Sequence, residues 1–374
     1  MSTQRDADCL VVGGGMVGAA IAYGLARAGE RVTLLDEGDD AFRAARGNFG
    51  LVWVQGKGVG RPDYVRWTMG SAAAWPAFAA ELHERTGVDV ELAQPGGLTL
   101  CLDEAELAQR AARLAAIRDA LGAPYPFEVL DARALRALVP EAGPEVVGAL
   151  WSPLDGHASP LRLLRALVQA FAAAGGRLVT GTRVDAVAAR DGGFEARTPT
   201  GAYRAARLVL AAGLGNRALA PQLGLAAPVA PERGQILVTE RMRPFLAYPT
   251  HTLRQTGEGV VQIGDSKEDA GLDDATTLAQ LSRMAARAVR CFPLLADVPI
   301  VRTWGALRVM TPDGYPVYQA SDAHPGAFVA TCHSGITLAA QHAGALADWI
   351  RGGPAPAPIR DFRAERFDGV ATHR

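Results

Sequence analysis

Cysteine is scarce in this sequence, and its four residues lie far apart at Cys9, Cys101, Cys291 and Cys332. There is no C-x-x-C pair. Structural zinc sites, iron–sulfur clusters and redox dithiols rely on closely spaced cysteines. The pattern argues against all three within this chain, and we expect buried thiols and no metal site.

Long apolar runs and an excess of one charge are missing as well. No stretch offers 18 uncharged apolar residues, which argues against a membrane-spanning helix. The 38 Lys and Arg residues balance 39 Asp and Glu, so nothing suggests a nucleic acid or a membrane surface as a partner. Only six residues precede the first predicted strand, too few for a signal peptide. We expect a cytoplasmic protein, and 374 residues are enough for two domains.

The stretch 8–38 has the pattern of a strand, a glycine-rich turn, a helix and a second strand. Gly13, Gly15 and Gly18 occupy the G-x-G-x-x-G positions, and Asp36 ends the second strand 18 residues after Gly18. In dinucleotide-binding folds these glycines allow a tight turn and close approach of a pyrophosphate, which lies at the helix N-terminus. The acidic residue at the end of the second strand, here Asp36, accepts hydrogen bonds from a ribose of the dinucleotide. The sequence therefore predicts a Rossmann-type dinucleotide site, with FAD and NAD both open.

The rest of the chain alternates between helical and extended patterns. Helices are predicted over 64–85, 103–121, 131–139, 160–174, 273–291 and 336–350. Strands are predicted over 98–102, 148–151, 207–213, 235–239, 252–255, 260–264 and 327–331, with a hairpin from 177–187 and 194–198. We expect the 103–121 helix to be a solvated outer element. The turn-rich segment 39–60 is expected beside the cofactor, an ordinary surface loop being the alternative.

Four separated motifs resemble the flavin-dependent amine oxidoreductase family of D-amino acid oxidase, glycine oxidase and sarcosine oxidase. They are 12–18 with Asp36, 207–213, Leu307-Arg308 followed by Thr311-Pro312-Asp313-Gly314, and 333–338. The segments 47–58 and 330–340 carry a narrower resemblance, to the catalytic β subunits of bacterial D-hydroxyproline dehydrogenases and opine oxidases. The related hydrogen cyanide synthase is similar there too.

The resemblance implies an α/β fold, with a Rossmann-type FAD-binding domain and an inserted antiparallel-sheet α+β substrate domain. The FAD-binding domain would comprise 1–75, 148–220 and 305–374, and the substrate domain 76–147 and 221–304. Covalently flavinylated relatives use a cysteine just before the Thr-Pro-Asp loop. None lies between Cys291 and Cys332, so we expect non-covalent FAD.

The resemblance also implies which residues bind the FAD. Residues 48–51 would pass alongside the flavin, and Val184 would contact the adenine. Gly335 would open the last helix, whose positive end would face the flavin pyrimidine and stabilise the reduced form. The full implied set is Gly13, Gly15, Met16, Val17, Gly18, Asp36, Glu37, Arg43, Asn48, Gly50, Leu51, Val184, Ala212, Gly213, Gly335, Ile336 and Thr337.

Five residues are candidates for contact with the substrate. Arg308 matches the family arginine that holds the substrate carboxylate in a two-pronged salt bridge, a geometry that suits guanidinium; a solvated surface arginine is the alternative. His333 would lie on the loop over the flavin. The predicted antiparallel sheet carries His251, Arg254 and Lys267, and the sequence leaves open which of them face the flavin. His157, in a predicted turn, is either a site residue or an ordinary turn residue.

The implied reaction transfers hydride from the C–H next to a substrate nitrogen to flavin N5, which gives an imine. The substrate would be an amino-acid-type amine with a carboxylate, such as D-hydroxyproline, a D-amino acid or an opine. An oxygen-using glycine or sarcosine-type oxidase, a nicotinamide-dependent dehydrogenase and a nucleotide-holding non-catalytic subunit are the alternatives. The narrower resemblance to β subunits, together with the lack of an iron–sulfur cysteine set, implies partner subunits with electron-transfer centres, and FMN is possible at a subunit interface.

Overall fold

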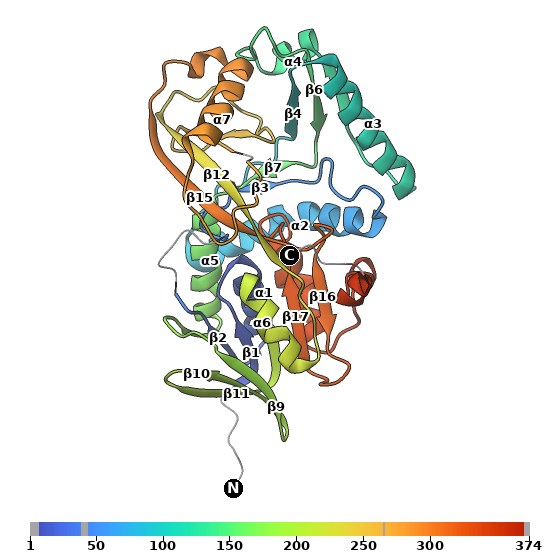
Figure 1. Ribbon diagram of the computed structural model, residues 1–374, viewed down its shortest axis with the longest axis vertical. Coiled ribbons are helices and arrows are strands. Elements are labelled where there is room, and N and C mark those ends of the chain that lie inside the picture. The colour runs from blue at the N-terminus through green and yellow to red at the C-terminus, as the bar shows by residue number, and fades with distance from the viewer. Residues whose placement is uncertain (1–6, 39–43, 265, 370–374) are drawn as a thin grey trace.

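The computed structural model describes residues 7–38, 44–264 and 266–369. Figure 1 shows a mainly parallel sheet with its helices in the lower half and antiparallel sheets with further helices in the upper half. Helix α2 (Pro62–Thr86) crosses between the two halves. The predicted combination of a parallel sheet and antiparallel sheets is confirmed.

The N-terminal strand β1 (Ala7–Val12) lies inside the parallel sheet. It pairs with β2 (Val32–Leu35) on one side and with β11 (Gly201–Leu210) on the other. The sheet continues with β8 (Arg177–Val179) beside β2 and with β17 (Ala327–Thr331) beside β11. Antiparallel additions are β16 (Val317–Ala320), β9 (Ala186–Arg190) and β10 (Gly193–Thr198). Helices cover the sheet, which explains why β1 and β2 are almost wholly apolar and buried.

Small side chains allow the helices to lie close to this sheet and to one another. Helix α1 (Met16–Arg27) is buried from Gly18 to Ala26. It contacts α5 (Pro160–Ala173) and the C-terminal helical segment. That segment consists of α8 (Ala339–Gln341), a π-helical stretch (His342–Leu346) and α9 (Ala347–Ile350). The short α6 (Asn216–Leu219) follows β11.

The upper half contains two antiparallel sheets and three helices. One sheet has the order β13 (Leu253–Gln255), β14 (Val260–Ile263), β12 (Ala230–Arg241) and β15 (Ile300–Met310). The other has the order β4 (Gly97–Cys101), β6 (Gly148–Ser152) and β5 (Glu128–Asp131). The helices are α3 (Glu104–Leu121), α4 (Ala132–Leu138) and α7 (Leu278–Cys291). A small ladder of β3 (Leu51–Val52) and β7 (Gly156–His157) links the segments beside α2.

Three local predictions need correction. Residues 177–179 form the parallel strand β8, so the hairpin consists of β9 and β10 alone. Helix α7 begins at Leu278, five residues later than 273. The last helix begins at Ala339 and is interrupted by π-helical geometry. The misplaced starts lie at element boundaries, where backbone contacts rather than periodicity decide the structure, whereas the π-helical stretch lies inside the last helix.

The predicted domain boundaries do not follow the strand pairing. Strand β6, assigned to the FAD-binding domain, pairs with β4 and β5 of the upper half. Strand β15 pairs with β12 from Ile300 to Met310, so the boundary at 304/305 divides one strand. The two-domain organisation itself stays a prediction.

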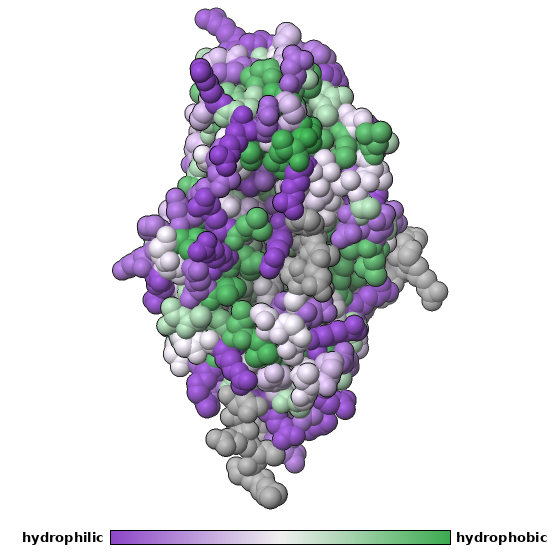
Figure 2. Space-filling model, turned by 90° about the vertical axis from the view of Figure 1, so that its left-hand side faces the viewer, coloured by the Kyte–Doolittle hydropathy of each residue, from purple (hydrophilic) through white to green (hydrophobic). Residues whose placement is uncertain are grey.

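The surface is mixed in character. On the face drawn in Figure 2, hydrophobic residues form small patches interrupted by hydrophilic ones. In the described part of the chain, no helix combines the length and the apolar character that crossing a membrane requires. Within the same residues, no group of three His, Cys, Asp or Glu side chains is placed to hold a metal ion.

Candidate active site

The glycine-rich turn after β1 has the backbone geometry that the sequence predicts. Gly13 has a φ of 103°, and a Cβ there would lie 2.5 Å from the carbonyl oxygen of Ala211. A Cβ on Gly18 would collide with the carbonyl oxygen of Gly13. Gly15 caps α1 without a side-chain hydrogen bond, and the first helical turn has no acidic residue. The N-terminal N–H groups of Met16 and its neighbours are thus suited to an anion such as a pyrophosphate.

Asp36 lies at the carboxyl end of β2 and faces this turn. Its carboxylate accepts hydrogen bonds from the N–H groups of Gly14 (2.6 Å) and Gly38 (3.0 Å). The Asp36 carbonyl accepts a hydrogen bond from the Thr182 N–H, 2.8 Å away. This bond places the segment after β8 next to Asp36.

The other predicted contacts of the adenine half gather around Asp36. Val184 is buried in one apolar cluster with Leu35, and Ala212 packs against the same cluster. Gly213 lies three residues after the end of β11, and Glu37 follows Asp36. Arg43 lies outside the described residues. The tight turn, the uncapped helix terminus and the acid fit a dinucleotide.

A cavity of about 430 Å³ lies beside these elements. Its walls come from the segment 44–57, from α3, from β12 and β15, and from the turn 332–337. Four residues predicted to contact the cofactor line it: Asn48, Leu51, Ile336 and Thr337. Four predicted substrate residues line it as well: His251, Lys267, Arg308 and His333. Tertiary structure therefore brings four of the five substrate candidates and four of the predicted cofactor residues to one chamber.

The turn 332–338 joins the cavity to the dinucleotide-binding elements. A Cβ on Gly335 would lie 3.4 Å from the Cβ of Met16 in the first turn of α1. The Thr337 hydroxyl donates to the Leu51 carbonyl (3.2 Å) and accepts from the Trp53 N–H (3.1 Å). The last helical segment starts at Ala339 and continues through the π-helical stretch to Ile350. That its positive end faces the flavin stays a prediction.

Asp155, fully buried, shapes the loop 53–57, which contacts the turn 332–338. Its carboxylate accepts hydrogen bonds from the backbone N–H groups of Val54 (2.5 Å) and Gln55 (3.2 Å). Burial raises the pKa of this carboxyl to about 7, although the two N–H groups and the charge of Lys57 lower it. Sequence inspection missed Asp155, which lies in an unremarkable turn.

Lys57 is a second residue that sequence inspection missed. Its ammonium donates hydrogen bonds to the hydroxyls of Ser334 (2.9 Å) and Thr337 (3.2 Å). Burial lowers the pKa of Lys57 to about 8. Lys57 and Lys267 are the only lysines in the sequence, and both line the cavity. This concentration of lysine in an otherwise arginine-based chain is the signal that could have identified Lys57.

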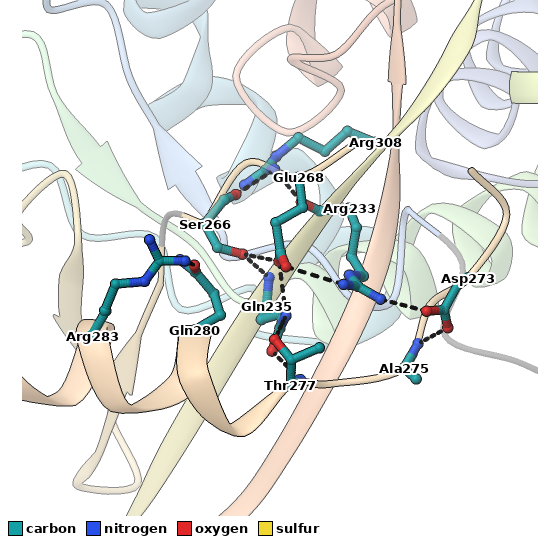
Figure 3. Close-up of polar contacts among 10 residues, drawn as sticks. All are labelled: Arg233, Gln235, Ser266, Glu268, Asp273, Ala275, Thr277, Gln280, Arg283 and Arg308. Carbon is teal, nitrogen blue, oxygen red and sulfur yellow. Dashed lines mark hydrogen bonds and ion pairs between the residues drawn. The ribbon is translucent and has the colours of Figure 1, made fainter. Parts of the chain in front are cut away.

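Arg308 is held by a polar network that Figure 3 draws. Its Nη1 atom donates to the carbonyl of Ser266 (2.7 Å) and to the carboxylate of Glu232 (3.2 Å). Beneath it, Arg233 is buried and pairs with Glu268 (3.0 Å) and Asp273 (2.7 Å). The network ties the segment 266–268 to β12 and thereby positions Lys267 between Ser266 and Glu268.

Both cavity histidines are held in the neutral form. Desolvation in the cavity and the charges of Lys57, Arg308 and Lys267 lower the pKa of His333, although the residue as a whole is exposed. Burial lowers the pKa of His251 to about 3, with a contribution from Arg110. The His251 Nε2 atom lies 3.5 Å from Nη2 of Arg110. Neither histidine can supply a positive charge to a ligand at neutral pH.

Arg254 does not reach the cavity. Its guanidinium donates to Gln262 (3.0 Å), lies 3.2 Å from Nδ1 of His157 and stacks over the Phe49 ring. Burial lowers the pKa of Arg254 to about 10. Gly50, with a φ of 97°, would place a Cβ 3.0 Å from this guanidinium. Arg254 and His157 therefore support the loop 48–51 from behind.

Helix α3 is mostly exposed, as the prediction of a solvated outer element expects, but it also contributes Arg110, Arg113 and Leu114 to the cavity wall. Among the described residues that line the cavity, every charged side chain is basic and none is a carboxylate. The basic residues are Lys57, Arg110, Arg113, Lys267 and Arg308. The chamber is thus suited to an anionic ligand.

Comparison with known proteins adds independent information. A family model described as FAD dependent oxidoreductase matches residues 8–349. The chain is 41% identical over 363 residues to a subunit of opine oxidase from Agrobacterium tumefaciens strain Ach5, and the match covers 97% of this chain and 98% of that protein. Glycine oxidase from Geobacillus kaustophilus is 28% identical over 340 residues, 88% of this chain and 89% of that protein. A crystal structure of glycine oxidase from Geobacillus kaustophilus has a TM-score of 0.88 and 26% identity, covering 95% of this chain and 98% of that one.

Proposed function

Because this chain belongs to the family of FAD-dependent oxidoreductases, we propose that it oxidises the C–N bond of an amino-acid-type amine inside the cavity. The predicted family resemblance is confirmed, and FAD is the cofactor of the family. The observation that carries the proposal is the cavity itself. Its lining includes the turn 332–337 and the loop 48–57. The rest of its wall comes from the antiparallel sheet and α3, and none of the described lining residues carries a carboxylate.

We assign the FAD to the elements around the parallel sheet. The turn Gly13–Gly18 would hold the pyrophosphate, Asp36 the ribose, and the segment near Val184 the adenine. Asn48, Leu51 and Thr337 would lie along the flavin. When bound, FAD supplies the two-electron acceptor for the hydride that leaves the carbon next to the substrate nitrogen, so that the amine becomes an imine.

The remaining cavity residues would bind and orient the substrate. Arg308 is the proposed partner of the substrate carboxylate, and its contacts with Ser266 and Glu232 limit the positions that its guanidinium can adopt. Lys57 and Lys267 add positive charge on the same side. Because His251 and His333 stay neutral, they are suited to hydrogen bonding rather than to ion pairing.

The substrate class follows from the relatives' names and from the charge of the cavity. Opine oxidase and glycine oxidase act on amines that carry carboxylates. We therefore propose an opine, D-hydroxyproline or another D-amino acid as the substrate. An oxygen-using oxidase of the glycine or sarcosine type is the alternative.

A multi-subunit assembly is the second part of the proposal. The relatives from opine oxidase are each named as one subunit of that enzyme and match almost the whole chain. An enzyme named by its subunits has at least one further chain. We propose a partner that carries electron-transfer centres, with FMN possible at the interface. The cytoplasmic location inferred from sequence stays a prediction.

Anaerobic titration of the purified holoprotein tests the reaction. Glycine, N-methylglycine, D-amino acids, D-hydroxyproline and opines would be added in turn while flavin absorbance is recorded. We expect at least one amine carboxylate to bleach the flavin stoichiometrically. If dithionite bleaches the flavin but no amine does, the proposed function is wrong. Reoxidation by air, or only by an artificial acceptor, then separates an oxidase from a dehydrogenase.

A further inference from the structure

The five cations of the cavity fall into two groups. The first group consists of Lys57, Lys267 and Arg308, and their charges all act on the ring of His333. These residues come from the loop beside the cofactor elements, from the segment after β14 and from β15. One carboxylate bound at Arg308 would lie among them.

The second group lies on α3. Arg110 and Arg113 are three residues apart, so both project from the same side of the helix. Arg110 approaches His251, whereas Arg113 donates from Nε and Nη2 to the carbonyl of Gly56 at 3.2 and 3.0 Å. Arg110 also pairs with Glu106 at 2.9 Å. No carboxylate in the described part of the chain pairs with Arg113.

Two further features indicate that this end of the cavity is built for a ligand. The Nδ1 atom of His251 is buried and has no hydrogen-bond partner among the described residues. Uncharged side chains also line the chamber, namely Leu114, Leu150 and Ile236. Arg110 has Glu106 as its counterion, whereas Arg113 has no carboxylate partner among the described residues and lines the cavity. A single substrate carboxylate at Arg308 leaves Arg113 available to a second anionic group.

We propose that Arg113, assisted by Arg110, forms a second carboxylate subsite at the end of the cavity opposite Arg308. This inference rests on the proposed function and narrows its substrate class. The substrate would be a secondary amine with a carboxylate on both sides of the nitrogen, as in an N-(carboxyalkyl) amino acid. One carboxylate lies at Arg308, the other at α3, and the reacting C–N bond lies between them.

A matched pair of ligands tests the subsite in the holoprotein, together with any partner chain that co-purifies. N-(1-carboxyethyl)norvaline and N-isopropylnorvaline differ only in a carboxylate that replaces a methyl group. Dissociation constants would be measured by calorimetry and by perturbation of the flavin spectrum. We expect the wild type to bind the dicarboxylate at least about tenfold more tightly, since a charge-assisted hydrogen bond contributes at least that factor.

Variants on α3 assign this preference to a residue. Arg113→Gln should lose most of the tenfold preference and bind the monocarboxylate within about twofold of wild type, because only the second carboxylate loses its partner. Arg113→Lys should keep part of the preference. The matched control is Arg118→Gln, which removes one charge from the same helix at a position outside the cavity lining and should change neither constant.

Several outcomes would overturn the subsite. A wild type that does not discriminate between the two ligands has no second subsite, and this comparison decides the matter even if Arg113→Gln fails to retain FAD. Equal weakening of both ligands in Arg113→Gln would show that Arg113 acts through its contact with Gly56. Flavin bleaching by monocarboxylate amines only would refute the subsite while the proposed function stands. No bleaching by any amine would refute the proposed function itself.

Discussion

The Lys57 ammonium donates a hydrogen bond to the Ser334 hydroxyl over 2.9 Å, across 277 positions of the sequence. The Tyr64 hydroxyl donates to the same oxygen from α2, at 3.0 Å. The hydrogen bond between Lys57 and Ser334 fastens the loop beside the cofactor elements to the C-terminal turn. It also places a partly buried positive charge in the wall of the cavity.

Lys57→Met should change how stability depends on pH. Burial lowers the pKa of Lys57 from 10.5 to about 8. Below pH 8 the folded protein therefore retains a buried charge that costs about 3 kcal/mol, at 1.36 kcal/mol per pKa unit. Between pH 8 and 10.5 the unfolded chain binds more protons than the folded one, so this contribution to the free energy of unfolding rises with pH.

Urea unfolding at pH 7, 8, 9 and 10 measures the effect. We expect the stability of Lys57→Met relative to wild type to fall by up to about 3 kcal/mol from pH 7 to pH 10. Lys57→Gln, which keeps a polar group beside Ser334 and Thr337 but cannot titrate, should show the same trend. Parallel curves for all three proteins would contradict the buried-charge interpretation.

Asp155→Ala should loosen the loop that borders the cofactor. The Asp155 carboxylate is the acceptor for the Val54 and Gln55 N–H groups, and each unsatisfied buried donor costs about 1–3 kcal/mol. We expect a lower melting temperature and a lower FAD content after gel filtration. Asp155→Asn keeps an acceptor oxygen and should lose much less of both. If Asp155→Ala and Asp155→Asn lose equal stability and FAD, the negative charge of Asp155 matters rather than its acceptor oxygen.

The FAD should be non-covalent. The sequence has no cysteine from 292 to 331. Cys332 lines the cavity, but burial raises its pKa to about 12, and a protonated thiol is a poor nucleophile. Acid precipitation should leave yellow flavin in the supernatant for the wild type and for Cys332→Ser alike. Flavin that stays with the wild-type pellet would refute this prediction.

Arg308→Leu should lower kcat/KM by roughly 10²-fold or more, because a charge-assisted anchor that also orients the reacting C–H is lost. Arg308→Lys should recover little, since an ammonium lacks the planar fork. Anaerobic flavin bleaching measures the loss without interference from the electron acceptor, and FAD content should stay near that of wild type. The control is Arg302→Leu on the same strand, outside the cavity lining. If Arg308→Leu bleaches normally at a low substrate concentration, another cation of the cavity binds the substrate carboxylate.

The protein should purify from its native host together with at least one other chain. This chain has no closely spaced cysteines that could hold an iron–sulfur centre. Such a centre would transfer electrons from the flavin to an acceptor. Affinity purification at low salt, followed by size-exclusion chromatography and mass spectrometry, measures the composition. Full turnover with oxygen by a chain that co-purifies with nothing would contradict the expectation.

The sequence by itself determined the elements whose residues are contiguous. The turn Gly13–Gly18, the acid at the end of β2 and the short buried strands follow from local glycine spacing and apolar periodicity. The same local signals placed α2 and β17 almost at their observed bounds. They also carried the family resemblance, which the comparisons confirmed.

Only the tertiary structure decided which polar side chains meet. Arg254 lies on a predicted strand like its neighbours, but its guanidinium turns toward His157 and away from the cavity. Arg113, on a helix whose composition indicates solvent exposure, faces the cavity. Lys57 and Asp155 became visible as site residues only through contacts across 277 and 101 positions. Periodicity records which residues share a face of one element, whereas the partner of that face is set by the packing of distant elements and the burial of charge between them.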